Sequence, residues 1–521
     1  MPKKLPLGLQ DFRKIIENGF LYVDKTEYLS RIVSQPGAYF LSRPRRFGKS
    51  ITVATLHELY SGSRELFQGL WIEDKWDWNK KHPVLRLSLT SIGFQSIGLR
   101  PALLQEISLI AEAQGITLKS EGLAARFREL IGAMAAGGHK TVVLVDEYDA
   151  PILHYLGTKL EQAVENREVL REFYTVLKDC DTLLELVFLT GVSKFSKTGI
   201  FSGLNNLVDL SMHPAFATML GYTQEELESN FSEEIEAAAV ALQLPRAQLL
   251  DKMREWYNGY RFHQHAEKVY NPVSVNNFFS RNKFENFWFA TGTPSFLVNL
   301  LRKEGSFDLD LTPVNPRGFD ALEPDRLRPE AILFLTGYLT IQDLTEDGLV
   351  QLAYPNKEVR DSMLEVLIEG FLAVDVERSA YLVIRLRNAF RENDVDKAME
   401  ILQGVFANLP YFLHEKYPEK FFHAAIHLLF TYMGIRIHSE ACTSEGRVDS
   451  LVETDTHVYI LEYKLDKSPQ EAIEQIRRKR YYRSAWHLGK PVIAVGVSFS
   501  SRTKNIEAWE TEEVKANDAR D

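Results

Sequence analysis

The sequence predicts an α/β fold with a parallel-sheet domain first, a helical region in the middle and a second α/β domain at the C-terminus. Apolar, β-branched runs alternate with helical stretches from about residue 40 to 210, and acidic helical stretches follow. The last hundred residues read as helix, three strands, helix, strand. Alternating strands and helices are typical of parallel sheets with crossover helices. We therefore expect domains at 1–211, 212–356 and 357–521, the last with its core at about 418–500.

Length and composition support several domains and exclude some classes of protein. A chain of 521 residues is longer than a single domain, which typically has ~100–200 residues. The net charge of −10 argues against an overall basic protein, although a local basic stripe is enough to contact phosphates. Cys180 and Cys442 lack the spacing of a disulfide framework or a zinc site. Without a signal core or an apolar run of ~20 residues, we expect a cytoplasmic protein with no membrane partner.

The first domain contains a phosphate-loop pattern between a strand and a helix. The expected strands are Ala38–Ser42, Val84–Leu89, Thr141–Val145 and Leu186–Thr190, and Ile51–Tyr60 is a helix. Gly48 lets the backbone approach phosphates, Lys49 reaches the β- and γ-oxygens, and the Ser50 hydroxyl can ligate Mg²⁺. Arg43 stands where GxxxxGK[ST] has glycine, so the loop is either altered or a weaker cradle.

A second pattern supplies the acids that such a site needs. The apolar strand before Asp146 and Glu147 matches a Walker B strand, in which Asp146 holds the metal and Glu147 orients water. Both could instead be exposed acids at a strand end. Thr190 or Ser193, at the tip of a further strand, could sense the γ-phosphate. We therefore predict an ATP and Mg²⁺ site.

Two arginines of the loop, Arg45 and Arg46, are added to the predicted nucleotide-binding residues. They could neutralise charge in the transition state or contact an acidic neighbour.

The middle of the chain changes in character. Gln224–Leu242 is helical and acidic, Trp256–Tyr260 is rich in aromatic residues, and Ala321–Arg328 is a plausible linker. A compact region, Ala331–Asn356, follows, and helices continue to about Tyr417. No chemistry is assigned to this region.

The C-terminal elements are expected in the order αβββαβ. The helices are about Lys420–Met433 and Pro469–Leu488, and the strands are Ile435–Glu440, Val448–Glu453, Val458–Lys464 and Pro491–Val497. The polar tail after Trp509 is expected to be frayed.

Asp449, Glu462 and Lys464 form a candidate nuclease site on this sheet. Adjacent strands can bring the two acids together, and Lys464 faces the same side as Glu462 because strand side chains alternate. The acids would bind Mg²⁺, with Glu440 as a further ligand, and Lys464 would activate water or stabilise charge. The following helix brings Gln475 toward the metal and basic residues, Arg477–Arg483, toward a phosphate backbone. A surface ion pair, a solvated helix face and packed tyrosines are the simpler alternatives.

Several longer phrases closely resemble a bacterial family that joins an AAA-ATPase-like domain to a PD-(D/E)xK nuclease-superfamily domain. The matching phrases are Ser42–Ser50, Val145–Pro151, Thr190–Phe195, Phe201–Asn206, Tyr257–Tyr260, Tyr270–Pro272, Thr336–Leu339, Tyr354–Asn356, Gly446–Asp449, Glu462–Lys464 and Gln475–Ile476.

The resemblance implies a P-loop NTPase-like first domain and a PD-(D/E)xK-type last domain, and it makes an arginine at position 43 normal. It also implies Asp449, Glu462 and Lys464 as the nuclease core, with Gln475 on the accessory helix. Superfamily members often carry an acid on the first helix, where this chain offers His423 and His427, and Glu419 only at its start.

The predicted function is that of a hydrolase: an ATP-binding and ATP-hydrolysing protein that controls a Mg²⁺-dependent nuclease. The expected partner is nucleic acid, DNA in particular, and a homo-oligomer is possible. One alternative is a nucleotide-dependent switch or nucleic-acid-binding protein whose nuclease fold does not cut. Another is an ATPase with an interaction module, in which the two C-terminal acids are structural.

Overall fold

The computed structural model describes residues 3–156, 158–194, 200–201, 204, 206–288, 312–315, 319, 329–372, 376–407, 426–433, 436–443 and 446–514. These residues form two compact units, which meet in sequence between Arg360 and Asp361. Helix α15 (Lys357–Leu372) contains that boundary.

The first unit is built on a parallel five-stranded sheet in the order β2-β3-β4-β1-β5. Its strands are β1 (Gly37–Ser42), β2 (Val84–Ser88), β3 (Thr141–Asp146), β4 (Leu184–Gly191) and β5 (Val208–Asp209). Strands β3 and β4 are buried along their whole length, because their residues are almost all apolar. Runs of this kind suit a sheet covered on both faces, which fits the predicted P-loop NTPase-like domain.

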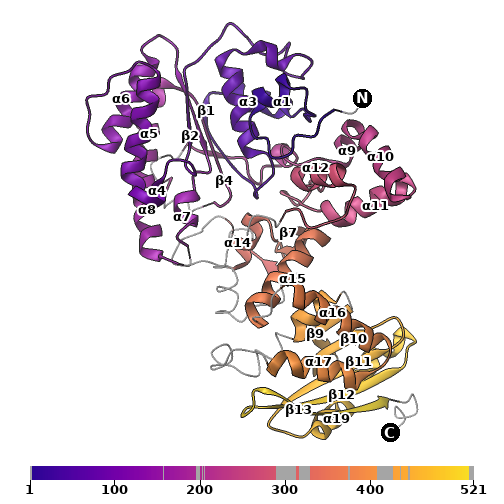
Figure 1. The fold of residues 1–521 in the computed structure, drawn as a ribbon. Coiled ribbons are helices and arrows are strands. Elements are labelled where there is room, and N and C mark those ends of the chain that lie inside the picture. Colours follow the sequence, from indigo (N-terminus) through magenta and orange to yellow (C-terminus); the bar gives the residue numbers. More distant parts are fainter. Residues whose placement is uncertain are drawn as a thin grey trace. The chain divides into compact units, whose positions relative to one another are not determined.

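Helices cover both faces of this sheet. Figure 1 shows α5 (Leu99–Ala113), α6 (Leu123–Ala135) and α8 (Leu160–Asp179) together on one side, and α1 (Phe12–Glu17) with α3 (Lys49–Ser61) on the other. The remaining helices of this part are α2 (Thr26–Val33), α4 (Phe94–Ile97) and α7 (Ala150–Leu153).

The middle region adds a helical cluster and a small antiparallel sheet. The helices are α9 (Gln224–Asn230), α10 (Ser232–Leu242), α11 (Arg246–Tyr257), α12 (Pro272–Arg281) and α14 (Pro329–Thr336). The sheet, in the order β6-β8-β7, comprises β6 (Thr312–Val314), β7 (Thr340–Leu344) and β8 (Val350–Ala353). Helices α9 and α12 start at side-chain caps: Thr223 forms a capping box with Glu226, and Asn271 precedes Pro272.

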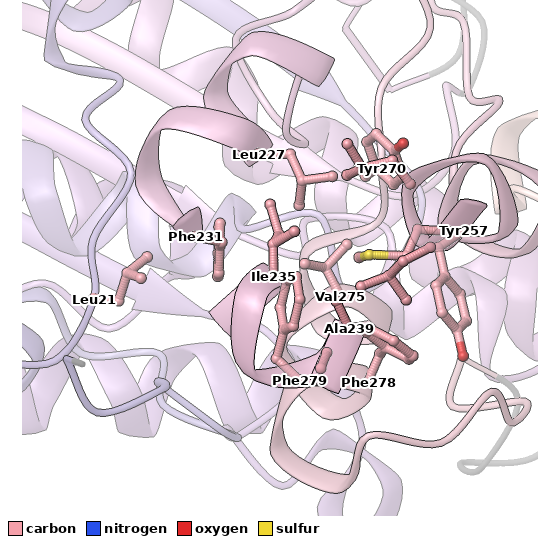
Figure 2. Close-up of a cluster of buried hydrophobic side chains, with 14 of the residues drawn as sticks. Leu21, Leu227, Phe231, Ile235, Ala239, Tyr257, Tyr270, Val275, Phe278 and Phe279 are labelled. Carbon is pink, nitrogen blue, oxygen red and sulfur yellow. The ribbon is translucent and has the colours of Figure 1, made fainter. Parts of the chain in front are cut away.

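One apolar cluster joins α9–α12 to the N-terminal segment. Figure 2 shows Leu21 near Phe231, with Ile235, Phe278 and Phe279 in the same cluster, and all five are nearly inaccessible to solvent. Full burial of such side chains contributes roughly 1.5–3 kcal/mol each. The middle region is therefore held firmly to the first domain.

The second unit contains a five-stranded mixed sheet in the order β13-β12-β11-β10-β9. The strands are β9 (Arg436–Thr443), β10 (Gly446–Glu453), β11 (Val458–Leu465), β12 (Val492–Ser500) and β13 (Asn505–Val514), and the helices are α16 (Val376–Arg391), α17 (Val395–Ala407) and α19 (Pro469–Arg478). Only the β11–β12 pair is parallel.

Residues 224–242 are helical as expected and form the two helices α9 and α10. Two other expectations about elements were wrong. The helix at Pro469 ends at Arg478 and not at Leu488, since Arg480 adopts a left-handed φ of 47° and Tyr481 and Tyr482 turn into the core. The tail expected after Trp509 lies partly in β13, which runs on to Val514.

Of the remaining expectations, the linker at 321–328 lies outside the described residues. Within the described part of the chain, every helix is too short or too polar to cross a membrane.

Candidate functional site

The phosphate loop joins β1 to α3. Gly48 has a φ of +96°, which favours glycine, and the next residue, Lys49, begins the helix. The first helical N–H groups have no acceptor within the helix and point out of its positive end. This end of α3 is therefore suited to bind an anion such as a phosphate.

Lys49, the first residue of α3, is only 5% exposed. Its Nζ donates to the carbonyl oxygens of Arg43 at 2.8 Å and Pro44 at 2.9 Å. Burial lowers the pKa of Lys49, and the nearby carboxylates of Glu147 and Asp146 oppose that shift. The lysine thus lies close to Asp146, the last residue of β3, and to Glu147, which follows it.

Arg43, which replaces the first glycine of the motif, points away from the loop into the core. Its guanidinium donates to the carbonyl oxygens of Ser211 at 2.6 Å and Phe216 at 2.9 Å, and lies 4.1 Å from the Phe262 ring centroid. Burial lowers its pKa to about 9. The backbone N–H of Arg43 donates to Gly191 O at 3.1 Å. The side chain therefore anchors the loop, and it does not occupy the phosphate side.

The other predicted loop residues differ in their surroundings. Arg45 is exposed, whereas Arg46 is half-buried, with a φ of +69°, and donates to Phe287 O at 2.5 Å. Ser50 is half-buried in the first turn of α3. Arg45 is thus exposed and Ser50 is partly exposed, whereas the Arg46 guanidinium is hydrogen-bonded to the middle region.

Asp146, the last residue of β3, and Glu147, which follows it, lie beside the tip of β4, the strand between β3 and β1. Asp146 is 4% exposed, and its carboxylate accepts from the Thr190 hydroxyl at 2.6 Å. Glu147 has a left-handed φ of 53°, and burial raises its pKa. Because β4 separates β1 from β3, Thr190 lies in the strand between the lysine loop and Asp146.

Asp149, to which the sequence assigns no role, is hydrogen-bonded to the residues that follow β4. Its carboxylate accepts from the Ser193 backbone N–H at 2.6 Å and from the Ser193 hydroxyl at 2.5 Å, and burial raises its pKa. A Cβ at Gly191 would lie 2.6 Å from the Tyr148 ring and 2.8 Å from Asp149 Oδ1. Two sequence features could have pointed to Asp149: its position three residues after Asp146, and the glycine that follows Thr190.

The second site is on the sheet of the C-terminal unit. Strands β10 and β11 pair antiparallel with Ser450 opposite Leu461, which sets Asp449 opposite Glu462. The Asp449 carboxylate accepts from the Tyr463 backbone N–H at 2.8 Å. The register therefore brings the two predicted acids to neighbouring positions on one face of the sheet.

Glu462 is the most buried acid of this site, at 2% exposure. Its Oε1 accepts from Lys464 Nζ at 2.9 Å and from the Gln475 side chain, while Oε2 has no hydrogen-bond partner among the described residues. Burial, with the nearby Asp449, raises the pKa of Glu462 to about 7. A buried carboxylate oxygen without a donor is costly, and a cation would relieve that cost.

Helix α19 delivers Gln475 to this acid because a glycine lets the helix approach the sheet. Gly496 pairs with Glu462 across β11 and β12, and a Cβ on it would lie 2.2 Å from Pro469 O. Ser468 caps the helix by accepting from the Glu471 N–H. Asp449, Glu462, Lys464 and Gln475 are thus brought together from three elements.

The donor set fits a hard divalent cation, which prefers carboxylate oxygens. The described residues contain no group of three His, Cys, Asp or Glu residues that could hold a metal. Backbone register sets Glu440 opposite Asp449, but its side chain lies outside the described part. Glu419 and His423 lie outside the described residues as well, and His427 is buried, 3.4 Å from the Thr431 hydroxyl.

The basic stretch beyond Gln475 is shorter as a helix than expected. Arg477 pairs with Glu512 of β13, and both side chains are partly exposed. Tyr481 and Tyr482 are buried, which agrees with the packed-flank alternative. Arg478 is exposed at the end of α19.

Family models match an N-terminal and a C-terminal part of the chain. A family model described as a predicted AAA-ATPase matches residues 6–201, and one described as the PD-(D/E)XK nuclease superfamily matches residues 417–509. An uncharacterized protein from the vnfD 5′ region of Azotobacter chroococcum mcd 1 is 37% identical over 526 residues, covering 98% of this chain and 99% of that protein.

Two solved structures to which this chain is similar show a distant likeness. The Aeropyrum pernix ORC2 protein in its ADP form is 13% identical with a TM-score of 0.31, over 69% of this chain and 97% of that one. The Aeropyrum pernix ORC1 protein in complex with DNA is 11% identical with a TM-score of 0.23, over 66% and 91%. These scores are too low to carry an argument.

Proposed function

Since the chain belongs to the family in which a predicted AAA-ATPase domain precedes a PD-(D/E)XK nuclease-superfamily domain, we propose that it binds and hydrolyses ATP to control a Mg²⁺-dependent nuclease. The proposed nucleic acid is DNA. The observation that supports cleavage most is Glu462, a buried carboxylate with one free oxygen beside Asp449, whose other oxygen is held by Lys464 and Gln475.

In the first unit, the α3 N-terminus and Lys49 bind the phosphates, and Arg45 and Arg46 are proposed to add charge around them. Ser50 and Asp146 would hold Mg²⁺. Glu147 positions the attacking water, and its raised pKa suits a group that accepts a proton.

In the second unit, Asp449 and Glu462 would hold Mg²⁺, which when bound polarises the scissile phosphate. Lys464 stabilises the developing charge or activates water, and Gln475 orients the Glu462 carboxylate through its hydrogen bond to Oε1. The path of the chain supports the proposal that ATP controls the nuclease, because the first unit continues into the second within α15.

A second candidate function is a nucleotide-dependent nucleic-acid-binding protein that does not cut. It is favoured by the contacts of Glu462 Oε1, because Lys464 and Gln475 donate to this oxygen and can stabilise the carboxylate without a metal.

The test is cleavage of supercoiled and single-stranded DNA, with RNA for comparison, by the full chain in Mg²⁺ or Mn²⁺, with and without ATP. Glu462→Gln should abolish cleavage, while Glu474→Gln, an exposed acid next to Gln475, should not. Lys49→Ala should abolish ATP binding and any effect of ATP on cleavage, whereas Lys178→Ala, an exposed lysine on α8, should leave both intact. If the parent cuts nothing in any metal, the non-cleaving candidate is favoured.

A further inference from the structure

A fully buried carboxylate, Glu358, lies at the start of α15 in the first unit. One oxygen accepts from the backbone N–H groups of Phe287 at 2.5 Å and Trp288 at 2.7 Å. The other accepts from the Ser274 hydroxyl at 2.7 Å. Three donors from two distant segments therefore converge on one acid.

The Phe287–Trp288 turn also contacts the phosphate loop. Phe287 O accepts from Arg46 Nη1 at 2.5 Å, and Trp288 Nε1 donates to Arg45 O at 3.4 Å. The backbone of Phe287 is thus hydrogen-bonded on both sides: its N–H donates to Glu358, and its carbonyl accepts from Arg46. A shift of the acid would displace the backbone to which this arginine is bonded.

The charges of the two groups are coupled as well. Burial raises the pKa of Glu358 to about 7, and the hydrogen bonds and the Arg46 guanidinium oppose that rise. Burial lowers the pKa of Arg46, and Glu358 opposes that shift. Among the described residues, Tyr257 and Tyr260 also interact with the acid, and burial raises their pKa values. Within this part of the chain, Arg46 is the cation that favours the ionised acid.

We propose that Glu358 is a positioning residue for nucleotide binding: its carboxylate fixes the Phe287–Trp288 turn and, by its charge, the Arg46 guanidinium in the arrangement that receives the phosphates. This inference rests on the proposed ATP site. It gives the middle region, to which the sequence assigns no chemistry, a part in nucleotide binding. It also makes the first turn of α15 sensitive to the state of the loop.

Glutamine separates charge from hydrogen bonding at this position. Its carbonyl can accept from both backbone N–H groups, and its amide can donate to the rotated Ser274 hydroxyl. Only the charge that faces Arg46 is lost. In the full chain, binding of a fluorescent ATP analogue is measured at pH 6 and pH 8, and each variant is compared with the parent at the same pH, so that the titration of the nucleotide itself cancels.

At pH 8, Glu358→Gln should weaken binding about tenfold, the effect of one charge-assisted interaction. At pH 6 Glu358 is mostly protonated in the parent, so the ratio of the variant's affinity to that of the parent should approach one. Glu365→Gln is the control, because it changes another acid of α15, which is half-buried and accepts from the Tyr432 hydroxyl, and the ratio of its affinity to that of the parent should stay near one at both pH values.

Three results would overturn the proposal: an unchanged affinity at pH 8, an equal loss at both pH values, or an equal loss in the Glu365→Gln control. Should Glu358→Gln not fold, Arg46→Gln supplies the second test, because it should remove the same pH dependence. Where both variants fold, Glu358→Gln should have no further effect in the Arg46→Gln background. If the parent itself binds no ATP, the proposed function fails and this inference falls with it; if only Glu358→Gln behaves like the parent, the proposed function stands.

Discussion

Arg43→Gly restores the first glycine of the phosphate-loop motif, and the structure predicts that it harms the protein. The substitution leaves the carbonyl oxygens of Ser211 and Phe216 without their donor, at ~1–3 kcal/mol each. The lost contact with the Phe262 ring adds ~0.5–2 kcal/mol. Relief of the buried charge offsets part of this sum. We expect a net loss of about 3 kcal/mol in the first unit.

Hydrogen–deuterium exchange of the full chain measures this loss locally. A destabilisation of about 3 kcal/mol should speed exchange in β1 and β4 roughly a hundredfold, while peptides from β11 and β12 serve as an internal control. Arg45→Gly, an exposed arginine two residues along, should leave exchange in β1 unchanged. Parental protection in Arg43→Gly, or tighter ATP binding by that variant, would refute the anchoring role of Arg43.

Three further predictions follow from the two sites. Glu147→Gln should retain ATP binding but hydrolyse ATP ~100-fold more slowly in a phosphate-release assay; an unchanged rate would remove its catalytic role. Because the pKa of Glu462 is raised to about 7 and metal binding needs the carboxylate, Mn²⁺ affinity measured by calorimetry should fall as the pH drops from 8 to 6; a pH-independent affinity would contradict this. Gly191→Ala should destabilise the first unit by ~1–3 kcal/mol in melting experiments, because its Cβ would collide with Tyr148, whereas Gly132→Ala, in open space, should not.

Local patterns predicted most of the strands and both candidate sites. The four residues before Asp146 are all apolar, and the alternation around Glu462 and Lys464 sets their common face, so both patterns could be recognised in short stretches of sequence. Strand β13 was missed because its second half is almost entirely polar, with the run Glu510–Glu513, as an edge strand with an exposed face allows.

The hydrogen-bond partners of single charged side chains could not be predicted from the sequence. Two of the carbonyl partners of Arg43 lie more than 160 residues away, and Glu358 is bonded to backbone groups 70 and 71 residues earlier. An acid in the first turn of a helix ordinarily stabilises the helix dipole in water. Nothing in the sequence around Glu358 distinguishes that role from a buried one.

Strand β13 also determines how the C-terminal domain tolerates truncation. Strand β12 is buried along all nine residues and pairs with β13 on one side, whereas the nuclease-superfamily match ends at residue 509, inside β13. A fragment cut at that match would keep only part of the outer strand and uncover backbone groups of an apolar strand. Such an edge is a template for intermolecular pairing. Fragments that end before Val514 are therefore expected to aggregate on expression, whatever the state of the catalytic side chains.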